Sequence, residues 1–321
     1  MAECELRHST FWHSFASCLS LRHRTPILWP MRLFAWSDLH VDFPANHELL
    51  VGLSNADFRY DALLVAGDVS SDPEKLMHTL RLLRRRFREV AFVPGNHDLW
   101  VPSGSTLSSL DKLHDLHAAC LGEGIRVEPF EVDAGGRPVR VVPLRSWYLK
   151  PEEGDGSLFL EKPGEDPTLR AWMDNYRIKW KHLPTGVSAA EHILSLNHLP
   201  PPATAVFPAP ASPVTITFSH FLPRVELVFS DWAAFQEDGR TSGHDRAPEF
   251  NFTRVAGCRQ LDELLRRLGS SIHVYGHQHR NRDRVIDGVR YVSHCLGYPN
   301  EWGGAAASQS HVRPLEIAPA G

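Results

Sequence analysis

The sequence has 321 residues, of which 42% are hydrophobic and 22% are charged, and its formal net charge is −4. It contains no run of about 18 or more apolar residues, the length that a membrane-spanning helix needs, so we expect no membrane partner. A slightly acidic chain also gives no reason to expect nucleic acid as a partner, whereas small phosphorylated substrates stay open. The length suits one large core or at most two domains.

The cysteines are odd in number, widely spread and without a CxxC pair: Cys4, Cys18, Cys120, Cys258 and Cys295. This usage is typical of a reducing compartment, so we expect an intracellular, cytoplasmic protein. Histidine is abundant, at 19 residues, which makes metal binding worth testing.

Residues 1–30 differ in composition from the rest of the chain. They contain three arginines and several serines, and Glu3 and Glu5 are their only acidic residues. An organelle-targeting peptide has this kind of composition, and so does an unstructured extension. Met31 leads directly into the first predicted strand, which favours the extension. We therefore predict a single domain over residues 31–321.

Strands and helices alternate after Met31. Short hydrophobic runs predict strands at 32–36, 61–66 and 89–93. Between the last two, Asp72-Pro73 is a typical helix start, and Leu76, Leu80 and Leu83 share one face of a helix that continues to about Arg88. A strand–helix–strand unit of about 30 residues is typical of parallel βαβ structure, so the fold class is α/β.

The later elements follow from caps, turns and breakers. We predict a helix at 107–121 that ends at Gly122 or Gly124, a strand at 140–143, and capped helices opening at Asp166-Pro167 and at Ser188–Glu191. We further predict an exposed loop at 200–213, strands at 214–219 and 272–276, a helix at 259–268, and a hairpin of 284–287 and 289–293 turning at Asp287-Gly288.

Polar residues follow five of these strands directly. They are Asp38 and His40, then Asp68, then Asn96, His97 and Asp98, then His220, and last His277 and His279. In open α/β sheets the carboxyl ends of strands form the edge at which ligands bind. Each residue alone has an ordinary explanation, such as a helix cap for the aspartates or a turn for Asn96. Their joint occurrence at strand ends indicates one site.

The residue types indicate the chemistry of that site. Carboxylate, amide and imidazole groups without a thiolate suit Mn²⁺, Fe²⁺/³⁺ or Zn²⁺. Two aspartates, one asparagine and four histidines make seven candidate ligands, more than one ion with an open position can take, so we expect two ions with Asp68 between them. We also expect Gly67, Gly95 and Gly276 to let the backbone turn so that the next side chain faces the metals.

The motifs Asp-x-His, Gly-Asp, Gly-Asn-His-Asp, a later single His and Gly-His-x-His occur in this order between residues 38 and 279. The ordered set resembles the calcineurin-like metallophosphoesterase superfamily. The resemblance implies a four-layer α/β/β/α sandwich. It also implies hydrolysis of phosphoester bonds, in which a hydroxide shared by two metal ions attacks phosphorus.

The resemblance also assigns roles by position. One metal ion would be held by Asp38, His40, Asp68 and His279, and the second by Asp68, Asn96, His220 and His277. His97 would not be a ligand. It would donate a hydrogen bond or a proton to the phosphate, and Asp98 would orient its ring.

The branch and the substrate are less defined. After Asp68 the chain has neither the arginine typical of serine/threonine protein phosphatases nor the tyrosine ligand of purple acid phosphatases, because Ser71 stands at that position. Other stretches, among them DGVRYVSHCLGYP, resemble plant and algal members without an established substrate. We expect a phosphomonoesterase that acts on a small molecule or a phosphorylated protein. The alternatives are a phosphodiesterase acting on cyclic or linked nucleotides, and a non-catalytic scaffold, against which the complete ligand set argues.

Overall fold

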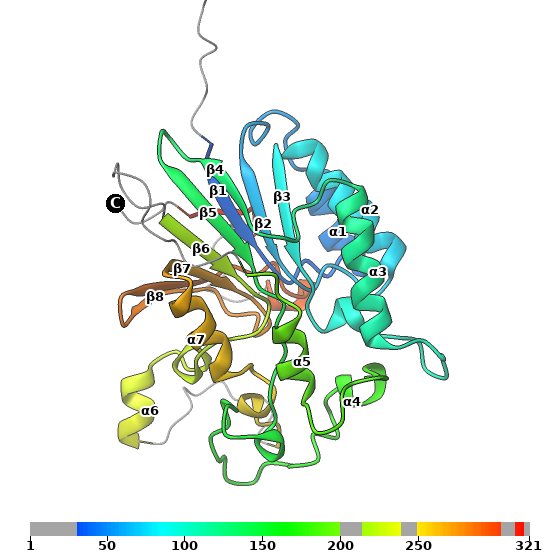
Figure 1. The fold of residues 1–321 in the computed structure, drawn as a ribbon, viewed down its shortest axis with the longest axis vertical. Helices are drawn as coiled ribbons and strands as arrows, with labels where there is room; N and C mark the ends of the chain where they lie inside the picture. The colour runs from blue at the N-terminus through cyan, green and yellow to red at the C-terminus, as the bar shows by residue number, and fades with distance from the viewer. Residues whose placement is uncertain (1–30, 200–213, 239–248, 303–311, 318–321) are drawn as a thin grey trace, which may run out of the picture.

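The computed structural model describes residues 31–199, 214–238, 249–302 and 312–317. Two β-sheets pack face to face, and helices cover their outer sides (Figure 1). This architecture is the predicted α/β sandwich. No helix within the described ranges has the length and the apolar character that crossing a membrane requires.

The first sheet has the strand order β10-β1-β2-β3. The strands β1 (Leu33–Trp36), β2 (Ala62–Ala66) and β3 (Glu89–Val93) run parallel, and the short β10 (Leu315–Glu316) pairs with β1 in the antiparallel sense. The helices α1 (Pro44–Val51), α2 (Pro73–Arg86) and α3 (Ser109–Gly122) lie together on one side of it (Figure 1). The predicted strands at 32–36, 61–66 and 89–93 are confirmed.

The second sheet has the order β4-β5-β6-β7-β9-β8. Its strands are β4 (Phe130–Asp133), β5 (Pro138–Pro143), β6 (Val214–Phe218), β7 (Ser270–Tyr275), β8 (Arg282–Ile286) and β9 (Val289–Ser293). The four central strands are parallel, and an antiparallel hairpin closes each edge. The helices α5 (Ala189–Ser195) and α7 (Arg259–Arg267) lie on the side of this sheet away from α1–α3, while α4 (Asp174–Arg177) and α6 (Trp232–Asp238) belong to the connecting segments (Figure 1).

Side-chain alternation along the strands explains why the sheets stack. On β2, Leu63 and Val65 pack with the helices, whereas Ala62 and Leu64 face the second sheet. Between the sheets, the inward-facing apolar residues of the first sheet pack against those of β5, β6, β7 and β9. These side chains are buried. Each fully buried aliphatic side chain stabilises the fold by roughly 1.5–3 kcal/mol relative to an exposed one.

Local signals read from the sequence are confirmed at three places. The carboxylate of Asp72 accepts hydrogen bonds from the backbone N–H groups of Glu74 and Lys75 and begins α2. Ser188 and Glu191 form the capping box of α5. The turn between β8 and β9 uses positive φ at both Asp287 and Gly288, as a type I′ hairpin requires.

The predicted helix at Asp166-Pro167 is wrong. The Asp166 carboxylate accepts a hydrogen bond from the backbone N–H of Thr168 at 3.0 Å, which closes a local turn instead of a helix. Leu169 then takes a φ of 51°, which ends any helical path, and the next helix is the four-residue α4. The helices α1, α4 and α6 and the short strands β4 and β10 were not predicted. The predictions for residues 1–30 and for the loop 200–213 lie outside the described residues.

Candidate metal centre

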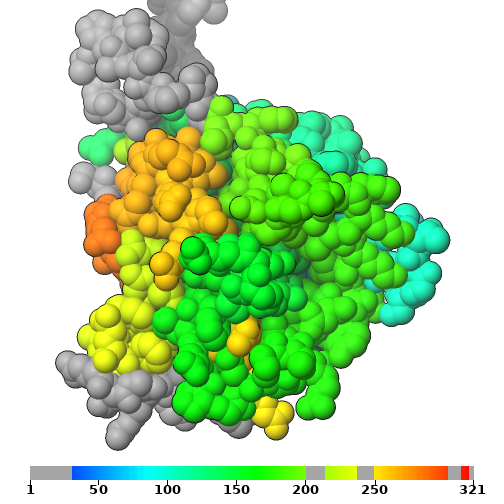
Figure 2. Space-filling view, turned by 60° about the horizontal axis from the view of Figure 1, so that its bottom comes forward, coloured from blue at the N-terminus to red at the C-terminus, as the bar shows by residue number. Residues whose placement is uncertain are grey.

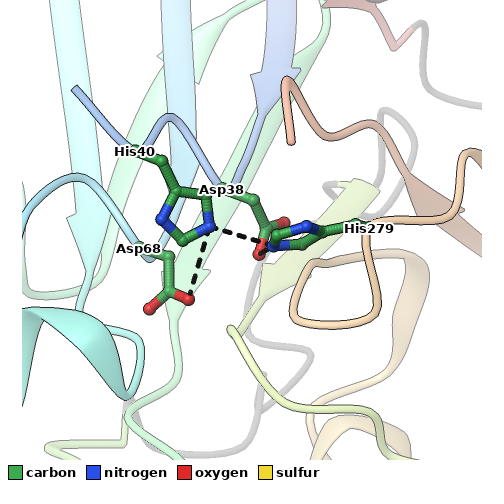
Figure 3. Close-up of side chains that lie close together, drawn as sticks. All are labelled: Asp38, His40, Asp68 and His279. Atoms are coloured by element: carbon green, nitrogen blue, oxygen red, sulfur yellow. Dashed lines mark hydrogen bonds and ion pairs between the residues drawn. The ribbon is translucent and has the colours of Figure 1, made fainter. Parts of the chain in front are cut away.

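The structure brings the seven predicted ligand residues together where the strands of both sheets end. Figure 3 shows four of them: Asp38 and His40 follow β1, Asp68 follows β2, and His279 follows β7. Potential ligand atoms of these four residues all lie within 4.8 Å of one another. The Nε2 atoms of His40 and His279 are 2.9 Å apart, and His279 Nε2 lies 3.3 Å from Asp38 Oδ1. These four residues form the first ligand group.

The remaining three residues form the second ligand group beside the first. His220 Nε2 lies 3.1 Å from Asn96 Oδ1 and 3.2 Å from His277 Nδ1. Asp68 Oδ2 lies between the groups, 3.9 Å from His40 Nε2 and 3.5 Å from His220 Nε2. This position is the one that a bridging ligand occupies.

The donor chemistry of the second group fits a cation. His220 Nδ1 lies 2.9 Å from the carbonyl oxygen of Ala66, and His277 Nε2 lies 2.9 Å from that of Val255. A carbonyl only accepts, so these two nitrogens carry the hydrogens, and the lone pairs of the other two nitrogens face each other and Asn96 Oδ1. Spacings of 3.1–3.2 Å are what bonds of about 2.1 Å to one ion produce, roughly 3.0–3.4 Å between neighbouring ligands.

The electrostatics of the first group also favour a cation. Burial raises the pKa of Asp68 well above its usual value, and the nearby carboxylates of Asp98 and Asp38 raise this pKa further. Burial opposes the protonation of His279, but Asp38 and Glu301 raise its pKa to about 10. In the metal-free chain a proton on His279 thus partly neutralises the carboxylates, and an ion that binds His279 has to displace it.

The backbone at the centre is strained. Five of the seven predicted ligand residues have φ in the left-handed region: Asp38 at 52°, His40 at 41°, Asp68 at 57°, His277 at 74° and His279 at 53°. Such a conformation costs non-glycine residues of order 1–3 kcal/mol each and persists where the surrounding structure fixes it. It clusters at functional sites, which supports a functional role for these loops.

The motif glycines act in two different ways. Gly67 has a φ of 83° and turns the chain, as predicted. Gly95 has no such φ; it leaves space instead, because a Cβ there would lie 2.2 Å from Asp68 Oδ1. The same holds for Gly276, whose Cβ would lie 2.7 Å from Asp38 Oδ2. The predicted turning role of Gly95 and Gly276 is therefore replaced by close packing against the ligands.

His97 lies on the accessible side of the centre. Its side chain is 17% exposed, whereas that of Asp68 is 2% exposed. The ring stacks on Trp100 with centroids 3.7 Å apart, and its Nε2 lies 3.9 Å from Asp68 Oδ2. Burial, with His279 and His220 acting in the same direction, lowers the pKa of His97 to about 3. The imidazole is therefore neutral before a phosphate binds.

Asp98 does not orient the His97 ring as predicted. Its buried carboxylate accepts hydrogen bonds from four backbone N–H groups instead: those of Asp68, Val69, Ser70 and Gly95, at 2.7–3.0 Å. Burial raises the pKa of Asp98 to about 6, against the effect of these hydrogen bonds. Asp98 therefore ties the loop after β2 to the loop after β3, and the ring of His97 is fixed by Trp100.

Three residues near the centre were not predicted. Asp174 Oδ1 accepts hydrogen bonds from Asn96 Nδ2 and Trp100 Nε1, at 3.0 and 2.6 Å. Glu301 Oε2 lies 2.8 Å from His279 Nδ1, and the ring of Tyr298 lies over His40. Asp174 stands in a stretch without periodicity or motif, so the sequence carried no signal for it. Tyr298 lies within DGVRYVSHCLGYP, the stretch that resembles plant and algal members, and this resemblance was the sequence signal that could have pointed to it.

Residues 144–199, the described part of the segment between β5 and β6, cover this end of the molecule. Figure 2, with the bottom of Figure 1 turned forward, shows a face made largely of green residues from this segment, flanked by orange residues around α7 and yellow residues around α6. Asp174 and Trp172 reach the centre from this segment, and Trp172 lies 5.8 Å from the His277 ring. The segment therefore builds one wall of the site.

The two-sheet sandwich and its cluster of aspartate and histidine side chains define a metallophosphoesterase. The sequence model of the calcineurin-like phosphoesterase family matches residues 31–281, so the chain belongs to this family of metal-dependent phosphoester hydrolases. The predicted family and the predicted enzyme class are confirmed.

Two comparisons carry more detail. The chain is 27% identical over 297 residues to the acyl-carrier-protein phosphodiesterase PptH of Mycobacterium tuberculosis (strain ATCC 25618 / H37Rv), a match that covers 84% of this chain and 79% of that protein. The crystal structure of phosphopantetheinyl hydrolase (PptH) from Mycobacterium tuberculosis superimposes with a TM-score of 0.64 at 23% identity, covering 91% of this chain and 97% of the other. The solved structure shows that the fold is shared.

Proposed function

We propose that the chain is a dinuclear metal-dependent phosphodiesterase that cleaves a phosphopantetheinyl group from a carrier protein. The similarity to PptH over most of both chains carries this proposal. It favours the diester over the phosphomonoester that the motifs alone led us to expect.

The residues of the two ligand groups would hold two ions, and both ions would share Asp68. Bound divalent ions of the Mn, Fe or Zn type supply charge that stabilises the phosphoryl oxygens and make water acidic enough to attack at neutral pH. The mixed nitrogen and oxygen donors are compatible with each of these metals.

The chain's own residues orient the reaction. His97 is partly exposed beside the ligands, so it can donate a hydrogen bond to a phosphoryl or leaving oxygen on the open side. Trp100 holds the His97 ring by stacking, and Asp174 fixes Trp100 by accepting from its indole N–H. His97 thus has one set orientation before the substrate arrives.

Aromatic side chains on two sides of the centre support a diester. Trp100 lies beside His97, while Trp172 and Phe252 lie 5.8 and 5.1 Å from the His277 ring. These three side chains are partly exposed. A phosphodiester has two organic substituents, and two apolar walls can contact one each, whereas a monoester would leave one wall unused.

The test uses the 321-residue protein loaded with Mn²⁺ and a carrier protein that bears its phosphopantetheinyl group. We expect mass spectrometry to show loss of the whole group from the carrier protein. The carrier protein without the group is the control. In parallel, bis(p-nitrophenyl) phosphate should be hydrolysed faster than p-nitrophenyl phosphate. Preference for the monoester, with an unchanged carrier protein, would restore the phosphomonoesterase prediction.

A further inference from the structure

The segment after β9 lies over the metal centre, although it is outside the residues that the family match covers. The backbone N–H groups of Leu296 and Gly297 donate to the carbonyl oxygens of Ser37 and Asp38, both at 3.0 Å. The side chain of Asn46 donates to the carbonyl oxygen of Gly297 at 2.8 Å. The chain leading to Tyr298 is therefore fixed to the loop that carries the first ligands.

A short turn then fixes Tyr298 itself. Glu301 Oε2 accepts a hydrogen bond from the backbone N–H of Tyr298 at 2.8 Å and lies 2.8 Å from His279 Nδ1. One carboxylate thus holds the start of the turn and orients a predicted metal ligand. Gly297 permits this arrangement, because a Cβ there would lie 2.7 Å from Glu301 Oε2.

The ring of Tyr298 packs on the imidazoles of the first ligand group. Its centroid lies 4.6 Å from that of His40 and 4.6 Å from that of His279. The tyrosine is partly exposed, on the same open side as His97. A substrate that enters on this side therefore meets Tyr298 and His97 together.

The hydroxyl group of Tyr298 points toward the same place as His97. The oxygen lies 3.5 Å from His97 Nε2, which is too long for a strong hydrogen bond, so the hydroxyl keeps its donor capacity. His97 Nε2 in turn lies 3.9 Å from Asp68 Oδ2, the atom between the two ligand groups. Two hydrogen-bonding groups thus flank the position next to the bridging carboxylate.

We propose that Tyr298 is a catalytic residue that donates a hydrogen bond from its hydroxyl to a phosphoryl oxygen of the substrate, beside His97. Charge grows on the phosphoryl oxygens in the transition state, and a donor already held in place stabilises that charge without rearrangement. The role rests on the phosphoester hydrolysis that defines the family. It does not depend on the carrier-protein substrate proposed above.

Tyr298→Phe separates this role from simple packing, because phenylalanine keeps the ring over His40 and His279 and removes only the hydroxyl. Tyr60→Phe is the matched control, since Tyr60 is exposed and precedes the amino end of β2, whereas Asp68 follows its carboxyl end. All proteins are loaded with Mn²⁺, and kcat and KM are measured on bis(p-nitrophenyl) phosphate and p-nitrophenyl phosphate. Metal content is measured by elemental analysis, and binding of inorganic phosphate by calorimetry.

We expect Tyr298→Phe to lower kcat roughly 10²-fold and to weaken phosphate binding, with metal content and melting temperature unchanged. Tyr60→Phe should match the wild type. Unchanged kcat and phosphate affinity in Tyr298→Phe would show that the ring only packs, and loss of metal would show that it supports the ligands; either result overturns the proposal. If the wild type leaves the carrier protein intact, only the substrate proposal fails. If neither nitrophenyl ester is hydrolysed, the proposal is tested by phosphate affinity: equal affinity of wild type and Tyr298→Phe overturns it, and weaker binding by Tyr298→Phe supports it.

Discussion

Asp174 and Asn96 are joined by a hydrogen bond of 3.0 Å from the asparagine Nδ2 to the aspartate Oδ1. This contact decides which end of the Asn96 amide faces the ligands: with the nitrogen held by Asp174, the oxygen lies toward His220. A residue from the segment between β5 and β6 thus sets the orientation of a predicted ligand on the loop after β3. The same carboxylate holds Trp100, on which His97 stacks.

Asp174→Ala should weaken metal binding and lower turnover together. The substitution leaves the N–H donors of Asn96 and Trp100 without an acceptor. Each unsatisfied buried donor lowers the free energy of unfolding by about 1–3 kcal/mol. Asp174→Asn is the matched control, because its carbonyl oxygen can accept both hydrogen bonds. Titration with Mn²⁺ and steady-state kinetics measure the two effects. Equal behaviour of the two variants would show that the hydrogen bonds at Oδ1 do not position the site.

Asp68→Asn should bind both ions poorly, because it keeps the shape of the side chain and removes the charge between the two ligand groups. Elemental analysis after Mn²⁺ loading measures the effect. Asp115→Asn, at an exposed position of α3, is the control. Two ions per chain and near-normal turnover in Asp68→Asn would contradict the bridging role.

His97→Ala should leave metal content and fold unchanged, since no ligand is lost. If the imidazole takes up a proton when the phosphate binds and passes it to the leaving oxygen, turnover of the variant should fall by roughly 10²–10⁴ on alkyl esters. A nitrophenyl ester needs little protonation of its leaving group and should suffer less. Kinetics on both ester types provide the measurement. An equal loss on both would leave His97 as a hydrogen-bond donor only.

Gly95→Ala should abolish metal binding in a folded protein. The added Cβ would lie 2.2 Å from Asp68 Oδ1 and 2.7 Å from His220 Cε1, so both side chains have to move. Overpacking of this kind typically costs about 1–3 kcal/mol, which circular dichroism melts can measure. Gly122→Ala at the end of α3 is the control, because a Cβ there meets nothing within 4 Å. Full metal binding in Gly95→Ala would show that the loops adapt.

His273 should make the fold sensitive to acid. Burial lowers its pKa from 6.5 to about 3, and its ring nitrogens contact the hydroxyls of Thr217 and Ser219. Between these two values the unfolded chain takes up a proton that the folded chain does not, so stability falls as the pH falls from 6.5. For one proton, the free energy of unfolding falls by at most about 1.4 kcal/mol for each pH unit.

Chemical unfolding of the metal-free chain at several pH values between 7 and 5 provides the check. His273→Gln removes the titrating group and should make the dependence shallower than in the wild type. His114→Gln, at an exposed position of α3, should leave it unchanged. Identical slopes for wild type and His273→Gln would mean that other groups dominate.

The motif residues and the central strands could be predicted because both depend on local sequence. A buried strand needs a short hydrophobic run, and a side chain directly after it has to lie at the strand end, as Asp68 and His220 do. The wall of the site could not be predicted in this way. Asp174 contacts Asn96 across 78 residues, and nothing near it in the sequence indicates that contact. The helix predicted to open at Asp166 is wrong because an aspartate before proline can close a turn as well as begin a helix.

The predicted ligands lie far apart in the sequence, so the ribosome synthesises them at different times. The backbone N–H of His277 donates to the Asp38 carboxylate across 239 residues. At 5–20 residues per second a ribosome needs roughly 10–50 s to add that length of chain. Asp38, His40 and Asp68 therefore leave the ribosome well before His277 and His279 exist. Until then the nascent chain offers each ion at most three of its four predicted ligands, so a complete centre forms only after both histidines have left the ribosome.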